Sequence, residues 1–111
     1  MERHIHTFRK TDHFMRRQWF RNVEDSFLEK ILPQLQYETN AADSRNALLI
    51  SQKCLTQMKK QGIDVPQIGK RQHLVVIWRA YLLITVYIYT SEKGNDFDLL
   101  CRLHGCTVTI C

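Results

Sequence analysis

A chain of 111 residues has the length of one domain and is too short for two independent cores, so we expect a single domain at 1–111 with a flexible basic segment at 1–10. An apolar fraction of 44%, a charged fraction of 24% and the lack of repeats or low-complexity stretches exclude an intrinsically disordered chain. The net charge of +5 is concentrated in two basic blocks, and it favours an acidic partner.

The first predicted element is an amphipathic helix that begins near Thr11 or Asp12, since either side chain can cap free backbone N–H groups. Pro33 removes a backbone donor, so we expect the helix to end or kink there. The buried side is indicated by an apolar stripe at helical spacing, formed by Phe20, Val23, Phe27 and Ile31 and widened by Met15, Trp19 and Leu28. This pattern turns Trp19 and Phe20 toward the core.

A second helix is predicted between a cap at Asn40 or Asp43 and a left-handed C-terminal cap at Gly62. Lys59 and Lys60 in its last turn suit the negative end of the helix dipole. Its apolar stripe consists of Ala47, Ile50, Cys54 and Met58, supported by Leu48 and Leu55.

The longest apolar run, residues 74–89, is rich in β-branched and aromatic side chains, which favour a strand. A single strand of about 17 residues would be about three times the usual length. No glycine, proline or asparagine between residues 70 and 91 offers a hairpin turn. We therefore expect a buried central helix near 70–90, surrounded by the rest of the domain.

A membrane span is the alternative for this run. As a helix it would be about 24 Å long, short of the roughly 30 Å hydrocarbon core. Arg79 would also lie inside it, which disfavours insertion. The length and Arg79 therefore favour a helix in the core of the domain over a membrane span.

The C-terminal part predicts a short helix that Asp96 caps and Gly105 ends, followed by a short extended tail from Cys106 to Cys111. About four helices joined by short loops predict an all-α fold, a small single-domain helical bundle. Such a small core makes formation of a homodimer a further expectation.

Four residues near the C-terminus are candidate zinc ligands: Cys101, His104, Cys106 and Cys111. Their spacing lacks the paired C-x2-C knuckle, so we expect no metal and no cofactor. The polar beginning of the chain lacks the apolar centre of a secretory signal peptide. We therefore expect the cytoplasm as compartment and reduced thiols at the four cysteines.

No phosphate loop, nucleophile elbow or paired-carboxylate motif is present, so we expect no catalytic residue and no enzyme activity. Arginines and aromatic residues alternate in the first basic block, and this mixture is typical of protein-interface hot spots. The predicted partner-binding residues are Arg9, Lys10, Arg16, Arg17, Trp19, Arg21, Lys53 and Lys60.

These observations predict a small non-enzymatic regulatory or adaptor protein that binds an acidic surface of another protein. The alternative is a nucleic-acid-binding protein that uses the basic blocks 3–21 and 53–79 for phosphate contacts and the aromatic side chains for base stacking. A second alternative is a membrane-associated protein that uses the predicted 74–89 helix.

Overall fold

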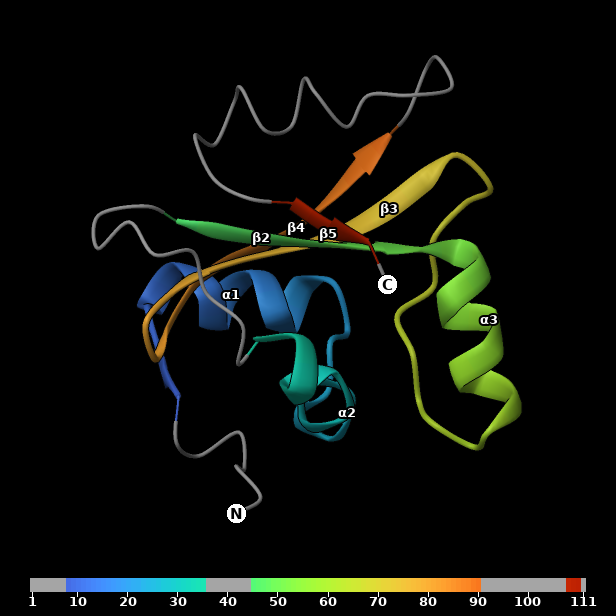
Figure 1. Ribbon diagram of the computed structural model, residues 1–111, viewed down its shortest axis with the longest axis horizontal. Helices are drawn as coiled ribbons and strands as arrows, with labels where there is room; N and C mark the ends of the chain where they lie inside the picture. The colour runs from blue at the N-terminus through green and yellow to red at the C-terminus, as the bar shows by residue number, and fades with distance from the viewer. Residues whose placement is uncertain (1–7, 36–44, 91–107, 111) are drawn as a thin grey trace.

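The computed structural model describes residues 8–35, 45–90 and 108–110. Within these ranges, three helices pack with a five-stranded sheet (Figure 1). In chain order the elements are β1 (Arg9–Lys10), α1 (Asp12–Phe20), α2 (Asp25–Leu35), β2 (Asn46–Ser51), α3 (Gln52–Lys60), β3 (Gln72–Arg79), β4 (Leu82–Thr90) and β5 (Val108–Ile110). The predicted all-α helical bundle is therefore wrong, and the protein has an α/β fold.

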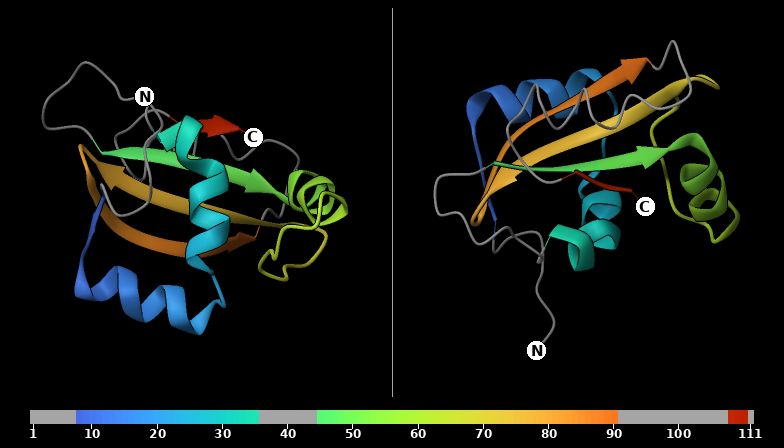
Figure 2. Two further views of the ribbon diagram at one scale, coloured as in Figure 1. Left: turned by 90° about the horizontal axis from the view of Figure 1, so that it is seen from below. Right: turned by 45° about the horizontal axis from the view of Figure 1, so that its top comes forward.

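The sheet has the strand order β1-β4-β3-β2-β5. The three central strands are antiparallel to one another, whereas the short edge strands β1 and β5 run parallel to β4 and β2. Both α1 and α2 lie on one face of this sheet, and α3 follows the end of β2 (Figure 2). The strand β1 lies at the edge of the sheet and is followed directly by α1.

The predicted central helix is instead the hairpin of β3 and β4. Arg79 pairs with Leu82, which leaves Ala80 and Tyr81 as the turn. Ala80 adopts φ 52°, a left-handed conformation that costs a residue with a side chain about 1–2 kcal/mol. Eight cross-strand pairs along the hairpin outweigh this cost, so the turn forms without glycine or asparagine.

The predicted 74–89 helix, on which the membrane-associated alternative was based, is therefore wrong, because these residues belong to the two strands and their turn. Among the helices of the described ranges, none has the length and apolar character needed to cross a membrane. Arg79 is the last residue of β3 and is exposed, so its charge is not buried in the core.

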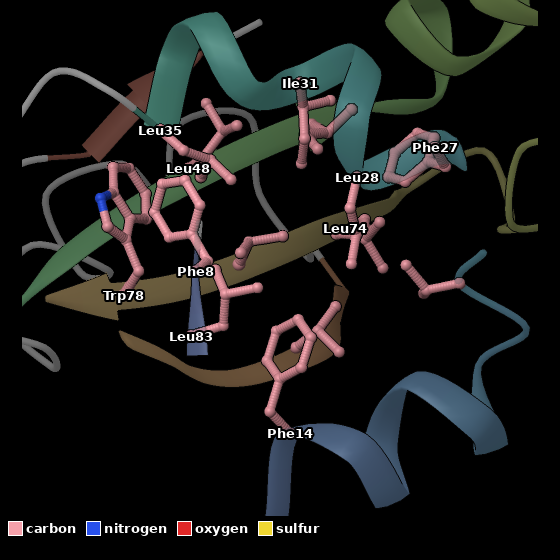
Figure 3. Close-up of a cluster of buried hydrophobic side chains, with 14 of the residues drawn as sticks. Phe8, Phe14, Phe27, Leu28, Ile31, Leu35, Leu48, Leu74, Trp78 and Leu83 are labelled. Atoms are coloured by element: carbon pink, nitrogen blue, oxygen red, sulfur yellow. The ribbon is translucent and has the colours of Figure 1, made fainter. Parts of the chain in front are cut away.

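The main core lies between the sheet and the helices (Figure 3). Phe14 of α1, Phe27 and Leu28 of α2, and Trp78 of β3 all have less than 2% of their surface exposed. The alternating residues of β3 explain this arrangement, since Leu74, Val76 and Trp78 point to the helices. The opposite face has its own buried cluster, formed by Ala47, Leu49, Val75 and Ile77.

The second predicted helix is correct at its end and wrong at its beginning. Residues Asn46–Ser51 form β2, and the helix α3 starts only at Gln52 with Ser51 as its cap. At the end, Gly62 has φ 86° as expected, and Ile63 N–H donates to the Met58 carbonyl oxygen at 3.2 Å. The apolar residues 47–50 are all buried, and β2 lies inside the sheet between β3 and β5.

The extended tail is confirmed at Val108–Ile110, which pair with β2. The predicted helix that begins at Asp96 lies outside the described residues, as do residues 1–7 of the predicted flexible segment.

Candidate interaction site

Thr11 fixes the start of α1 to the sheet. Its hydroxyl accepts a hydrogen bond from Phe14 N–H at 2.9 Å, as an N-cap does, and donates one to the Ile84 carbonyl oxygen at 2.7 Å. The Ile84 carbonyl can accept this bond because Ile84 is an extra residue in β4 with no partner in the β3–β4 register. Thr85 pairs with Ile77, and Leu83 pairs with Trp78. The predicted cap at Thr11 is therefore confirmed, and it positions α1 along β4.

The predicted single helix up to Pro33 is wrong, because α1 ends at Phe20 and α2 begins at Asp25. Asn22 adopts φ 54°, a left-handed conformation that asparagine tolerates better than most residues. Val23 N–H donates to the Gln18 carbonyl at 2.9 Å and Asn22 N–H to the Trp19 carbonyl at 3.2 Å, which is a Schellman motif. Pro33 lies within α2, which continues to Leu35.

The break changes which side of α1 is buried. Phe14 faces the sheet and is fully buried. Trp19 comes five residues later, about 140° around the helix, and therefore points away from the sheet. Its side chain is 79% exposed and that of Phe20 is 70% exposed, so the prediction that both turn toward the core is wrong.

Four side chains share this outward side of α1, which we name the aromatic–arginine face: Met15, Arg16, Trp19 and Phe20. All four are exposed. Each aromatic ring follows a side chain four residues earlier, Met15 before Trp19 and Arg16 before Phe20, so the four form two adjacent rows. The two rings contact edge to face, with their centroids 5.7 Å apart.

A hollow lies on each side of this face. The first has a volume of about 390 Å³ and lies between α1 and the start of α2; it is lined by Lys10, Met15, Gln18, Trp19, Asn22, Val23, Glu24 and Asp25. Three of its polar side chains bind one another, since the Asp25 carboxylate accepts hydrogen bonds from Lys10 Nζ at 2.6 Å and from Gln18 Nε2 at 2.7 Å.

The second hollow, which we name the Arg21 pocket, has a volume of about 460 Å³ and lies where the end of α1 meets β4 and the loop after α3; it is lined by Phe20, Arg21, Asn22, Val65, Gln67 and Ile88. The Arg21 Nε atom is buried, and it has no hydrogen-bond partner among the residues that the structure describes. A buried polar atom without a partner is uncommon in folded proteins, and Arg21 is one of three residues in the described part of the chain that have one.

The structure brings together only some of the predicted partner-binding residues. Arg16, Arg17, Trp19 and Arg21 lie within the last turns of α1 and its cap. Arg9 is exposed on β1, and Lys10 is held in its ion pair with Asp25. Lys53 and Lys60 are exposed on α3, which lies apart from α1 (Figure 1).

The segment between α3 and β3 separates the two basic regions. Val65 and Gln67 line the Arg21 pocket, and the same two residues line a hollow of about 250 Å³ beside Lys59 of α3. From residue 61 to 69 this segment has no lysine or arginine, and Asp64 adds a negative charge. The basic blocks therefore do not form one continuous surface in the described residues.

The predicted metal candidates Cys101, His104, Cys106 and Cys111 lie outside the described residues. Among the residues that are described, no group of three or more metal-ligating side chains comes together. Cys54 is disulfide-bonded, so the prediction of a reduced thiol is wrong at this residue. Disulfides persist mainly in oxidising compartments, and the cytoplasmic location stays a prediction.

Sequence reasoning missed Phe20 and Met15 as site residues because it assigned them to a buried stripe. Asn22 was the available signal, since asparagine at the end of an apolar helix is a common left-handed cap. Comparison of the chain with protein-family models, with curated proteins and with solved structures finds no match. The aromatic–arginine face and its two hollows are therefore the features of this chain that bear on its function.

Proposed function

We propose that this chain is a small regulatory or adaptor protein that uses the aromatic–arginine face to bind an acidic surface of another protein. The observation that carries the proposal is the exposure of two touching aromatic rings, 79% for Trp19 and 70% for Phe20. The core is filled from α1 by Phe14 instead, so the fold does not use these rings. Contiguous exposed apolar surface of this kind marks interaction sites.

The rings are large enough to anchor a partner. A buried aromatic side chain removes roughly 150–250 Å² from water, and at about 25 cal/mol per Å² each ring would contribute roughly 4–6 kcal/mol before the costs of association. Tryptophan and arginine are also the residues that dominate measured interface energies. The arrangement thus has the composition of a hot spot.

The charge next to the rings favours an acidic partner. Arg16 and Arg17 are both exposed, and neither forms a salt bridge with a described residue. Lys10 differs, because its ammonium group already neutralises Asp25. Free arginines beside exposed rings attract carboxylates and can pair with them in bidentate geometry.

A second copy of the chain is a less favourable occupant, since α1 faces of two copies would bring their arginines together. Sedimentation at several concentrations tests the predicted homodimer directly. If the chain forms a dimer and Trp19→Ala dissociates it, the aromatic–arginine face binds a second copy of the chain rather than another protein.

Affinity capture from the native host with four matched baits tests the proposal. The wild-type chain and a Lys53→Ala/Lys60→Ala variant are expected to capture the same protein, because α3 lies apart from the face. A Trp19→Ala/Phe20→Ala variant and an Arg16→Glu/Arg17→Glu variant are expected to lose it. Equal capture by all four baits would contradict the proposal.

The alternative of nucleic-acid binding rests on the same observation, because exposed rings beside arginines also suit base stacking and phosphate contact. Nuclease treatment before capture separates the two, as does salt. Retention on single-stranded RNA or DNA that falls steeply between low and moderate salt would favour nucleic acid. Capture that survives nuclease would favour the protein partner.

A further inference from the structure

We propose that the Arg21 pocket is a carboxylate-binding site, and that it receives an acidic side chain next to an apolar group of the partner. This inference rests on the proposed function, since it names the chemistry by which the partner is anchored beside the aromatic–arginine face. The pocket lies directly next to that face because Phe20 belongs to both.

The guanidinium group of Arg21 has no counter-charge among the described residues. Arg21 lines the pocket and is partly exposed, and no described residue forms a salt bridge with it. Its Nε–H is buried without an acceptor, so a ligand in the pocket would contact the outer N–H groups of the guanidinium. A planar guanidinium offers paired N–H groups, whose geometry matches the two oxygens of a carboxylate. The residues that line the pocket in the described structure contain no aspartate or glutamate that could take this role.

The walls of the pocket define the rest of the ligand. Phe20, Val65 and Ile88 provide apolar surface, while the side-chain amides of Asn22 and Gln67 can donate further hydrogen bonds to an anion. A carboxylate attached to an apolar group would contact both kinds of wall. An isolated inorganic anion would use only the polar part.

The contrast between the two hollows supports a negatively charged ligand for the Arg21 pocket. The hollow beside Trp19 contains Glu24 and Asp25, and its lysine is already paired. The Arg21 pocket contains an unpaired arginine, and the exposed Arg17 is four residues earlier on α1, on the same side of the helix. An anion is therefore attracted to the Arg21 pocket and repelled from its neighbour.

The probe for this site is phenylacetate, with phenylacetamide as its neutral control of nearly the same shape. Titration of the isotope-labelled chain is followed by nuclear magnetic resonance at the Arg21 Nε–H and at the backbone amides of Asn22 and Gln67. Phenylacetate is expected to shift all three signals and to bind about tenfold or more tightly than phenylacetamide, as expected for a charge-assisted hydrogen bond. Equal affinities would overturn the proposal.

Two variants test the residue itself. Arg21→Gln is expected to weaken phenylacetate binding about tenfold or more, and Arg21→Lys to weaken it less, since lysine keeps the charge and loses the planar fork. Arg21→Lys also serves if Arg21→Gln does not fold. Unchanged binding in either folded variant would overturn the assignment, and so would tighter binding of inorganic phosphate than of phenylacetate.

Capture experiments separate this inference from the proposed function. If Trp19→Ala/Phe20→Ala abolishes capture and the folded Arg21→Gln variant leaves it intact, the proposed function stands and the carboxylate anchor is wrong. If phenylacetate binds at Arg21 while the aromatic variant still captures the partner, the pocket stands and the proposed function is wrong. Loss of capture in both variants supports both.

Discussion

The two tryptophans of the chain lie in opposite environments. Trp78 is 1% exposed on β3, inside the core between the sheet and the helices, whereas Trp19 is 79% exposed on the outer side of α1. Both follow from local geometry: the alternation of β3 points Trp78 toward the helices, and the helical turn from Phe14 points Trp19 away from the sheet.

The difference separates stability from binding within one residue type. The ring of Trp78 leaves water when the chain folds, so its apolar surface stabilises the fold. The ring of Trp19 stays in water after folding, so the same driving force remains available to a partner. Changes at Trp78 should therefore lower stability, and changes at Trp19 should lower partner binding.

The largest expected effect is at Trp78. Trp78→Ala should lower the free energy of unfolding by about 3–5 kcal/mol, because it leaves a cavity in a core that cannot fully collapse. Urea denaturation followed by circular dichroism measures this. Trp78→Phe is the control and should cost less than half as much, since it keeps a ring, and the Trp78 Nε1 that it removes makes no hydrogen bond within the described structure.

A comparable effect is expected from Cys54, which is disulfide-bonded at the start of α3 and packs against the same core. Cys54→Ser should lower the free energy of unfolding by about 2–4 kcal/mol, the usual contribution of a native disulfide. Reductant should destabilise the wild type and leave the variant unchanged. If reductant has no effect on the wild type, the stability of the chain rests on the core alone.

A smaller effect is expected at Thr11, where the two regions are joined. Thr11→Val keeps the shape of the side chain and removes both hydrogen bonds of the hydroxyl, to Phe14 N–H and the Ile84 carbonyl. The free energy of unfolding should fall by about 1–2 kcal/mol. Thr56→Val on α3 is the control and should change it by less than about 0.5 kcal/mol, since Thr56 is exposed. Equal losses would contradict the role of Thr11.

Two of the helix caps were predictable from the sequence, whereas the sheet was not. Thr11 and Gly62 act through their own side chain or its absence, and both have the predicted roles. The hairpin depends on partners far along the chain, such as Leu48 opposite Val76, and on a turn at Ala80 that no turn residue announces. Cross-strand pairing overrode the turn chemistry, so the length argument for a helix failed.

The site shows the same limit. Arg16, Arg17, Trp19 and Arg21 were predicted from composition, and they do lie together. The predicted orientation of Trp19 is wrong, because the predicted helix continues past Asn22 and its buried apolar stripe includes Trp19. In the structure the helix ends at the left-handed Asn22. The Arg21 pocket could not be predicted, since Val65 and Ile88 reach it from other parts of the fold.

The smallest expected effect on stability is at Trp19, and it is the sharpest test of the comparison. Trp19→Ala should change the free energy of unfolding by less than about 0.5 kcal/mol, because the side chain is exposed and the fold gains little from it. Fluorescence quenching by acrylamide gives an independent reading: Trp19→Phe should leave only protected emission, from Trp78, and Trp78→Phe only accessible emission. If Trp19→Ala instead destabilises the chain by more than about 1 kcal/mol, the ring belongs to the fold, and its exposure no longer argues for a partner.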